Sequence, residues 1–111
     1  MDNCIFCKIR NGEIKSEIIY KDEDFMLIKD IEPQAKIHLL AIPTKHIGLI
    51  ENMPEDYVTI IGKVMGKVSH MQKKLGLTNG YRLIINQGKD ANQTVNHLHI
   101  HILGGEKLKD F

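Results

Sequence analysis

Short apolar segments separated by turn residues dominate the chain, and this pattern is typical of β-strands. They predict strands over residues 18–20, 25–29, 37–42, 81–86 and 97–103. One longer segment repeats its apolar residues every three or four positions, as a helix with one buried face does. That helix is expected to begin with Pro54 in its first turn and to run to Leu75, because Gly76 favours a helix end. A short helix is also expected over residues 6–10.

The order of these elements predicts an α+β fold. Short connections join the first three strands, which indicates an antiparallel meander, and the long helix then crosses to a final strand pair. We expect one five-stranded antiparallel sheet, one long helix and a short N-terminal helix within a single domain of residues 1–111. A sheet of this size with an uncovered edge also suggests a partner chain.

The last expected strand carries three histidines in strict alternation with aliphatic residues: His97-Leu98-His99-Ile100-His101-Ile102. Side chains two apart on a strand share one face and lie about 6.5 Å apart. Imidazole titrates near pH ~6.5, so such a row can supply nucleophiles, acids, bases or metal ligands. Packing alone does not easily explain three such histidines.

Composition excludes several classes of function. Of 111 residues, 42% are apolar and 26% are charged, which is typical of a globular protein. A net charge of +1 gives no indication of a nucleic-acid partner. The chain shows no long apolar segment that would span a membrane, and its first residues show no secretory signal. A cytoplasmic location is expected.

Two cysteines, Cys4 and Cys7, form a C-x-x-C pair. In a reducing compartment a lasting disulfide is not expected, which leaves a redox pair, half of a metal site, or two buried thiols. Redox pairs usually follow a strand, and only three residues precede Cys4. A closed zinc site needs four ligands, so histidines would have to complete it. The chain offers six: His38, His46, His70, His97, His99 and His101.

Several motifs together resemble the histidine triad (HIT) nucleotide-binding proteins, and in particular their Hint branch. The last strand matches the family signature, in which three histidines alternate with apolar residues. The resemblance covers almost the whole chain, since further matching segments follow one another in order: residues 4–9, 30–35, 38–43, 45–47, 80–82 and 103–105.

The resemblance implies an enzyme that cleaves purine nucleoside 5′-phosphoramidates, or related 5′-phosphate conjugates, at the α-phosphorus. His99 would attack phosphorus and form a nucleotidyl-histidine intermediate that water hydrolyses, with His101 and His38 completing the polar cluster. Asp30 would bind the ribose hydroxyls, while Asn86 and Thr94 would contact the phosphate. Gly88 would allow close backbone approach or a positive φ. Apolar side chains would surround the base: Phe6, Ile9, Ile14, Ile31 and Leu40.

The resemblance also implies a structural zinc ion and a homodimer. Some bacterial relatives complete a C-x-x-C zinc site with two histidines, and the matching residues are Cys4, Cys7, His46 and His97. The family pairs through the long helix and the strand after it. Two features depart from the Hint pattern: Thr94 and Asn92 replace a serine and a glycine. The chain also ends without the Trp-containing tail of eukaryotic relatives, which leaves the leaving-group preference open.

Two other functions stay open at this point. A zinc-dependent hydrolase would use His97, His99 and His101 as metal ligands. A regulatory protein would bind a purine nucleotide with little turnover. Neither the physiological substrate, the choice between adenine and guanine, nor a protein partner follows from the sequence.

Overall fold

A computed structural model of the protein describes residues 3–48 and 51–111; Met1, Asp2, Leu49 and Ile50, which belong to the expected domain of residues 1–111, lie outside the described part. The elements in chain order are α1 (Ile5–Arg10), β1 (Ile18–Lys21), β2 (Phe25–Lys29), β3 (Ile37–Pro43), α2 (Glu55–His70), β4 (Tyr81–Ile84), the 3₁₀ turn η1 (Lys89–Ala91) and β5 (Ile100–Gly104).

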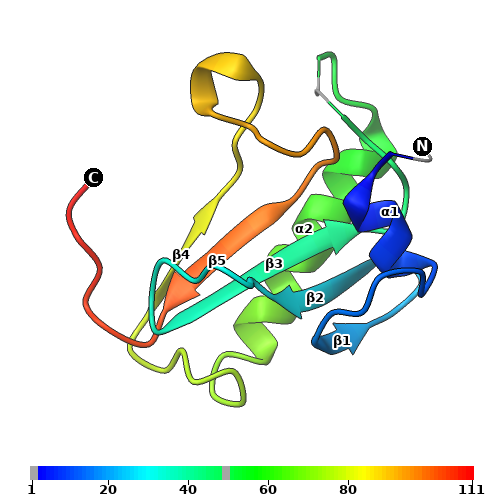
Figure 1. The fold of residues 1–111 in the computed structure, drawn as a ribbon. Coiled ribbons are helices and arrows are strands. Elements are labelled where there is room, and N and C mark those ends of the chain that lie inside the picture. The colour runs from blue at the N-terminus through cyan, green and yellow to red at the C-terminus, as the bar shows by residue number, and fades with distance from the viewer. Residues whose placement is uncertain (1–2, 49–50) are drawn as a thin grey trace.

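The strands form one antiparallel sheet in the order β1-β2-β3-β5-β4 (Figure 1). The last strand, β5, therefore lies between β3 and β4, and β4 forms an edge of the sheet. The α+β fold expected from the sequence is confirmed: five antiparallel strands, one long helix and one short N-terminal helix.

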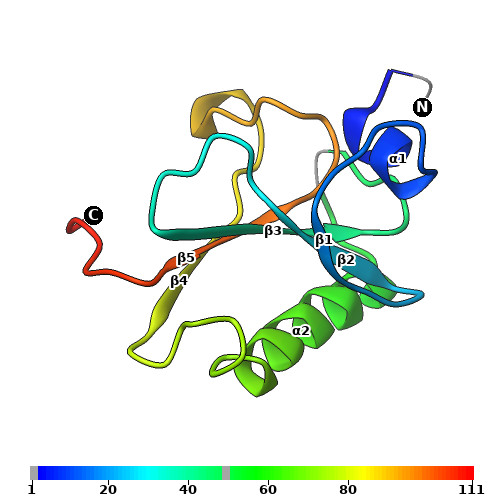
Figure 2. The ribbon, with the colours of Figure 1, turned by 60° about the horizontal axis from the view of Figure 1, so that its bottom comes forward.

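Two apolar layers cover the two faces of the sheet. On one face, side chains such as Leu39 and Ile102 pack against Val64 and Val68 of α2. On the other face, Leu40 and Ile42 of β3 pack with residues of α1. Figure 2 shows α2 beneath the sheet and α1 on the opposite side. Alternation along β3 therefore places His38 on the α1 face, together with Leu40 and Ile42.

The long helix is shorter than the apolar spacing indicated. Pro54 precedes the helix as its N-cap with extended backbone, instead of lying in the first turn. The helix ends at His70, and the chain continues to Gly76 in turns. Leu75 within these turns and Leu77 directly after them are both buried, at 8% and 1% exposure. These two leucines therefore pack into the core without lying in a helix. The spacing of apolar residues alone did not indicate this.

The final two strands are also shorter than predicted. The β4 strand ends at Ile84, and β5 begins at Ile100, so His97, Leu98 and His99 lie outside it. The β3–β5 ladder pairs Ala41 with Ile100 and stops there. Pro43, two residues beyond Ala41, has no backbone N–H to extend the ladder. Among the described residues, no helix is long and apolar enough to cross a membrane.

Candidate active site and metal cluster

A cavity of about 480 Å³ opens on the α1 face of the sheet. Its lining includes three histidines, His38, His99 and His101, although His99 lies outside the regular strand. The same cavity contains Asp30, Thr94 and all five apolar residues expected around a base: Phe6, Ile9, Ile14, Ile31 and Leu40. Apolar walls beside a few convergent polar groups are typical of a small-molecule site.

The backbone assigns the protons of His38. The backbone N–H of Gln34 donates to Nδ1 of His38 over 3.0 Å, so Nδ1 must accept and the hydrogen of the neutral ring lies on Nε2. That Nε2 is 2.9 Å from Nδ1 of His101 and 3.3 Å from Oδ2 of Asp30. The Nε2–H of His38 therefore donates towards His101, whose own hydrogen is left on Nε2.

A similar argument gives the free nitrogen of His99. Its Nδ1 lies 2.8 Å from the carbonyl oxygen of His97, and a carbonyl only accepts. The Nδ1–H of His99 thus donates to that carbonyl, and the lone pair of the neutral ring lies on Nε2. The ring packs edge-on against Phe6 and against His101, with centroid distances of 5.1 and 5.0 Å. These contacts hold an unprotonated nitrogen in place inside a cavity.

Burial keeps the histidine pair neutral. It lowers the pKa of His38 and of His101, and the charge of Asp30 opposes this shift in both rings. For His101, the neighbouring His99 and His38 lower the pKa further. Neutral rings are what the hydrogen bond between His38 and His101 requires, because a further proton between the two nitrogens would break it.

A second cluster lies at the other end of the histidine row. Cys4 Sγ is 3.3 Å from Nδ1 of His97, and Cys7 Sγ is 3.6 Å from the same atom and 3.3 Å from Nδ1 of His46. The four ligand atoms lie within 4.8 Å of one another. A tetrahedral zinc ion with about 2.3 Å bonds to sulfur and about 2.0–2.1 Å bonds to nitrogen separates its S and N ligands by about 3.5 Å. The cluster therefore fits zinc.

The protonation of His97 suits a metal ligand. Its Nε2 lies 2.9 Å from the carbonyl oxygen of Pro43 and must donate, which leaves the lone pair on Nδ1, towards both sulfurs. Metal-binding histidines typically donate their second ring N–H in this way. Complete burial also lowers the pKa of His97 to about 4. Burial raises the pKa of the Cys7 thiol, and its contact with Cys4 raises it further.

Asp30, His38 and His101 also lie close enough to hold a metal ion, within the same 4.8 Å limit. The position of the hydrogen on His38 argues against metal binding here. The Gln34 N–H occupies Nδ1 of His38, so Nε2 carries the hydrogen and offers no lone pair to a metal. The distances alone do not show which of the two clusters binds a metal ion. The hydrogen-bond donors and acceptors around each cluster distinguish them. One suits a metal ion and the other suits proton transfer.

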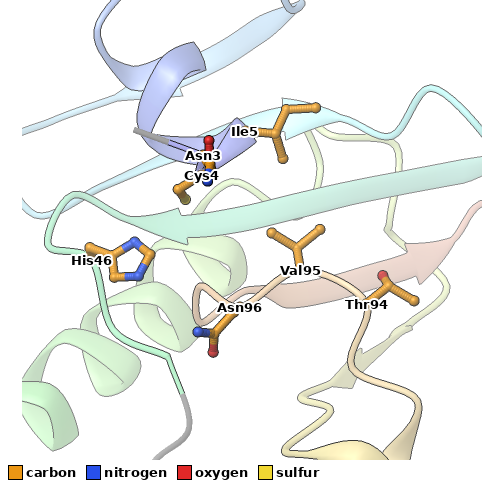
Figure 3. A pocket seen from close by; sticks show the side chains of 7 residues that line it. All are labelled: Asn3, Cys4, Ile5, His46, Thr94, Val95 and Asn96. Carbon is orange, nitrogen blue, oxygen red and sulfur yellow. The ribbon is translucent and has the colours of Figure 1, made fainter. Parts of the chain in front are cut away.

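A second cavity, of about 570 Å³, lies beside the cysteine–histidine cluster. Figure 3 shows Cys4 and His46 at one end of it and Thr94 at the other. Thr94 and Val95 line both this cavity and the one that holds His99. The segment before β5 and Ile5 of α1 therefore form part of the wall of both cavities.

Two residues expected at the phosphate do not line the cavity that holds His99. Asn86 follows β4, and Gly88 lines a separate hollow together with Thr94. Gly88 does have the expected positive φ, of 87°, but its N–H donates to Oε1 of Gln93 over 2.8 Å. Asn92 has φ 59° and ψ 37°, a left-handed conformation that asparagine tolerates and glycine adopts freely.

Sequence reasoning missed Gln34 and Val95. Gln34 acts through its backbone, which no side-chain pattern reveals, although it lies within the Asp30-to-Ala35 segment that resembled the family. Val95 is an ordinary apolar residue in a polar loop and lines both cavities. His70, by contrast, is exposed at the end of α2, and its Nδ1 lies 2.8 Å from the carbonyl oxygen of Gly66.

Known proteins share this fold and a large part of this sequence. The family model of the HIT domain matches residues 11–108. The chain is 45% identical over 104 residues to Protein HitA of Neisseria gonorrhoeae, which covers 94% of this chain and 97% of that protein. A HIT family hydrolase from Clostridium thermocellum has a TM-score of 0.92 at 41% identity, with 100% of this chain and 97% of that chain covered.

A zinc-bound histidine triad family protein from Mycobacterium smegmatis is 34% identical, with a TM-score of 0.82 over 95% of this chain and 76% of that one. The chain belongs to the HIT domain family. The resemblance to histidine triad proteins that the sequence indicated is therefore confirmed.

Proposed function

We propose that the protein is a hydrolase that cleaves purine nucleoside 5′-phosphoramidates, or related 5′-phosphate conjugates, at the α-phosphorus. The observation that carries this proposal is the set of hydrogen-bond contacts made by two rings beside the cavity, from which their tautomers follow. His99 presents an unprotonated Nε2, and His101 presents an Nε2–H next to it. A nucleophile and a proton donor on neighbouring rings are what a two-step displacement at phosphorus requires. Relatives named HIT family hydrolases support it.

In the first step, Nε2 of His99 bonds to phosphorus and the bond from phosphorus to the leaving nitrogen breaks. The departing amine takes a proton that comes from solvent and passes through His101 Nε2–H, so the His38–His101 pair ends the step neutral. The nucleotidylated ring of His99 then carries a positive charge, which its Nδ1–H shares with the carbonyl of His97. This charge corresponds to the one proton taken up from solvent, so no imidazolate anion forms.

In the second step, the oxygen of a water molecule bonds to phosphorus and the bond to Nε2 of His99 breaks. One proton of that water passes through His101 to solvent, which returns the proton taken up in the first step and restores the starting state. The products are the free amine and the nucleoside 5′-monophosphate. Two displacements through a covalent intermediate replace one difficult step.

The cavity supplies contacts for the nucleotide. We place the purine base among the apolar side chains on the α1 side and the ribose at Asp30. Thr94 lies at the cavity wall and offers a hydroxyl to the phosphate. The sequence-based assignment of Asn86 and Gly88 to the phosphate stays a proposal, because it requires the loop around η1 to move towards the cavity from where it lies here.

Asp30→Ala is expected to weaken the binding of ribonucleotides about tenfold and that of 2′-deoxyribonucleotides much less. One carboxylate can accept from both ribose hydroxyls, and a charge-assisted hydrogen bond contributes about 1.5–3 kcal/mol, part of which water replaces. Calorimetric titration with GMP or AMP and their 2′-deoxy forms measures the difference. Equal weakening of both ligand types would show that Asp30 does not bind the ribose.

We also propose one structural zinc ion per chain, held by Cys4, Cys7, His46 and His97. Four protein ligands leave no open coordination position, so the ion contributes stability and takes no part in the reaction. It would connect α1, which carries Phe6, to the segment that positions His99. This assignment removes His97 from the chemistry and argues against a zinc hydrolase built on the three histidines.

We further propose a homodimer that pairs through α2 and β4. Val58 and Met65 of α2 are 48% and 52% exposed and lie on one flank of the helix with Ile61. The opposite flank is occupied, because Lys63 bonds Asp24 and Lys67 lies over the ring of Tyr20. Ile61 of the first flank and Leu83 of the edge strand β4 pack against the same core cluster, and the side chains of β4 are all half-buried.

Light scattering at micromolar concentration should give twice the chain mass of 12.7 kDa. Met65→Lys should reduce the measured mass to that of one chain, because it places a charge in an apolar interface. Thr59→Lys, an exposed position on the occupied flank, is the matched control and should leave the dimer intact. A mass near 12.7 kDa for the unmodified protein would contradict the proposal.

The second candidate is a nucleotide-binding protein with little turnover. A relative from Candida albicans carries the name histidine triad nucleotide-binding protein, which is compatible with either function. Turnover of an adenosine 5′-phosphoramidate by the purified protein separates the two. A panel of adenosine and guanosine 5′-conjugates would then identify the preferred base and leaving group.

A further inference from the structure

We propose that Asp30, besides binding ribose, is a positioning residue for the proton donor: its carboxylate fixes the tautomer of His38 and, through it, the hydrogen on His101 Nε2. This inference rests on the proposed function for its catalytic consequence. It also has a test in the free protein that needs no substrate.

The first support is the contact itself. Asp30 Oδ2 lies 3.3 Å from His38 Nε2, the nitrogen that also faces His101 Nδ1 over 2.9 Å. A carboxylate accepts hydrogen bonds and donates none, so its proximity favours a hydrogen on that Nε2. The two side chains are only 17% and 3% exposed, so little water competes for this contact.

The second support is that the carboxylate is itself held in place. Its other oxygen, Oδ1, accepts from the backbone N–H of Glu32 over 2.8 Å. The Gln34 N–H approaches the opposite nitrogen of His38 at 3.0 Å. The turn after β2 therefore contacts both nitrogens of the His38 ring, with a donor at Nδ1 and an acceptor at Nε2. Both contacts favour the same tautomer.

The consequence reaches the cavity through His101. If His38 donates from Nε2, His101 must accept at Nδ1, and its hydrogen then lies on Nε2, where the leaving group is proposed to depart. An orienting carboxylate of this kind has a large effect in other enzymes, because the wrong imidazole tautomer cannot transfer the required proton. Here the Gln34 N–H still favours the correct tautomer, so we expect a smaller loss.

The decisive experiment compares Asp30→Asn with the unmodified protein on a 2′,3′-dideoxyribonucleoside 5′-phosphoramidate. This substrate has no ribose hydroxyl, so a residue that only binds ribose has no effect on its turnover. We expect kcat at saturating substrate to fall about tenfold. Glu23→Gln is the matched control, because it replaces an exposed carboxylate by an amide outside the cavity, and its kcat should not change.

The second measurement is ¹⁵N NMR of the histidine rings in the free protein. Unmodified protein should show His101 protonated on Nε2 alone, and Asp30→Asn should show a mixture of both tautomers, because an amide can donate to His38 Nε2 as well as accept. The pair of histidines should also titrate at lower pH in Asp30→Asn. The carboxylate raises the pKa of both rings, opposing burial and the neighbouring His99, and the other charged cavity residues, Lys15, Lys29 and Glu32, are unchanged.

The proposal requires both results. Unchanged kcat on the dideoxy substrate, or an unchanged His101 tautomer, would overturn it and leave Asp30 as a ribose ligand alone. If the unmodified protein turned over no phosphoramidate at all, the proposed function would fail. The tautomer measurement would then still decide whether Asp30 positions the histidine pair.

Discussion

His99→Ala should abolish turnover of nucleoside phosphoramidates while nucleotide binding persists. His99 Nε2 is the unprotonated nitrogen that would form the bond to phosphorus. His101 cannot replace it, because the hydrogen bond from His38 to Nδ1 of His101 leaves a hydrogen on Nε2 of His101. Removal of a catalytic nucleophile can cost on the order of 10⁶-fold in kcat, and we expect a loss of about 10⁴-fold or more. The proposed base, ribose and phosphate contacts lie on other residues.

Initial rates on an adenosine 5′-phosphoramidate measure the loss, and calorimetric titration with AMP measures the retained affinity. His70→Ala is the matched control, because it removes an exposed imidazole from α2, distant in sequence from the site, and should keep full activity. His101→Ala should be intermediate, with a loss of about 10²-fold, because general acid catalysis typically contributes about 10²–10⁴-fold.

Acid quench followed by mass spectrometry should detect a nucleotide attached to His99 in the unmodified protein during turnover. P–N substrates should also react faster than diadenosine polyphosphates, because a protonated amine leaves readily. Substantial activity in His99→Ala would exclude the covalent mechanism and would favour the metal-dependent hydrolase instead.

Removing zinc should lower the melting temperature by about 10–20 °C. A structural zinc site contributes its binding free energy to folding, and loss of about 3 kcal/mol shifts the midpoint of a domain of this size by this amount. The cluster links α1 to the segment before β5, and contacts across more than ninety residues of sequence would be lost. Calorimetry with and without chelator measures the shift.

Cys7→Ser should show the same low melting temperature, and chelator should lower it no further. This second arm separates loss of the metal from other effects of the chelator. Elemental analysis of tag-free protein, purified without chelator and supplied with zinc, should find one zinc per chain. A protein without bound metal under these conditions would exclude the zinc site.

The sequence by itself determined the elements that depend on local spacing. The apolar pattern of residues 25–29 and 37–42 predicted β2 and β3 almost to the residue. Nearly every side chain of these strands is buried, so the run of apolar residues itself marks the strand. The histidine signature identified the family. All five predicted base-pocket residues line one cavity, although generic apolar residues carry little local information.

Long-range contacts decided what local spacing could not. The helix expected to reach Leu75 ends at His70, since the packing of Leu75 and Leu77 from turns is a tertiary property. The strand expected from His97 starts at Ile100, because the ladder with β3 stops before Pro43. Asn86 and Gly88 lie outside the cavity because the position of a polar loop depends on contacts such as that of Gly88 with Gln93.

The protonation of the histidines also came only from the tertiary structure. The six imidazoles in the sequence have the same intrinsic chemistry, and four of them lie at His38, His97, His99 and His101. A carbonyl opposite His97 frees its Nδ1 for a metal, another opposite His99 frees its Nε2, and the Gln34 N–H turns His38 into a donor towards His101. Apart from His101, these partners are backbone groups, so their placement depends on the fold and no residue pattern indicates it.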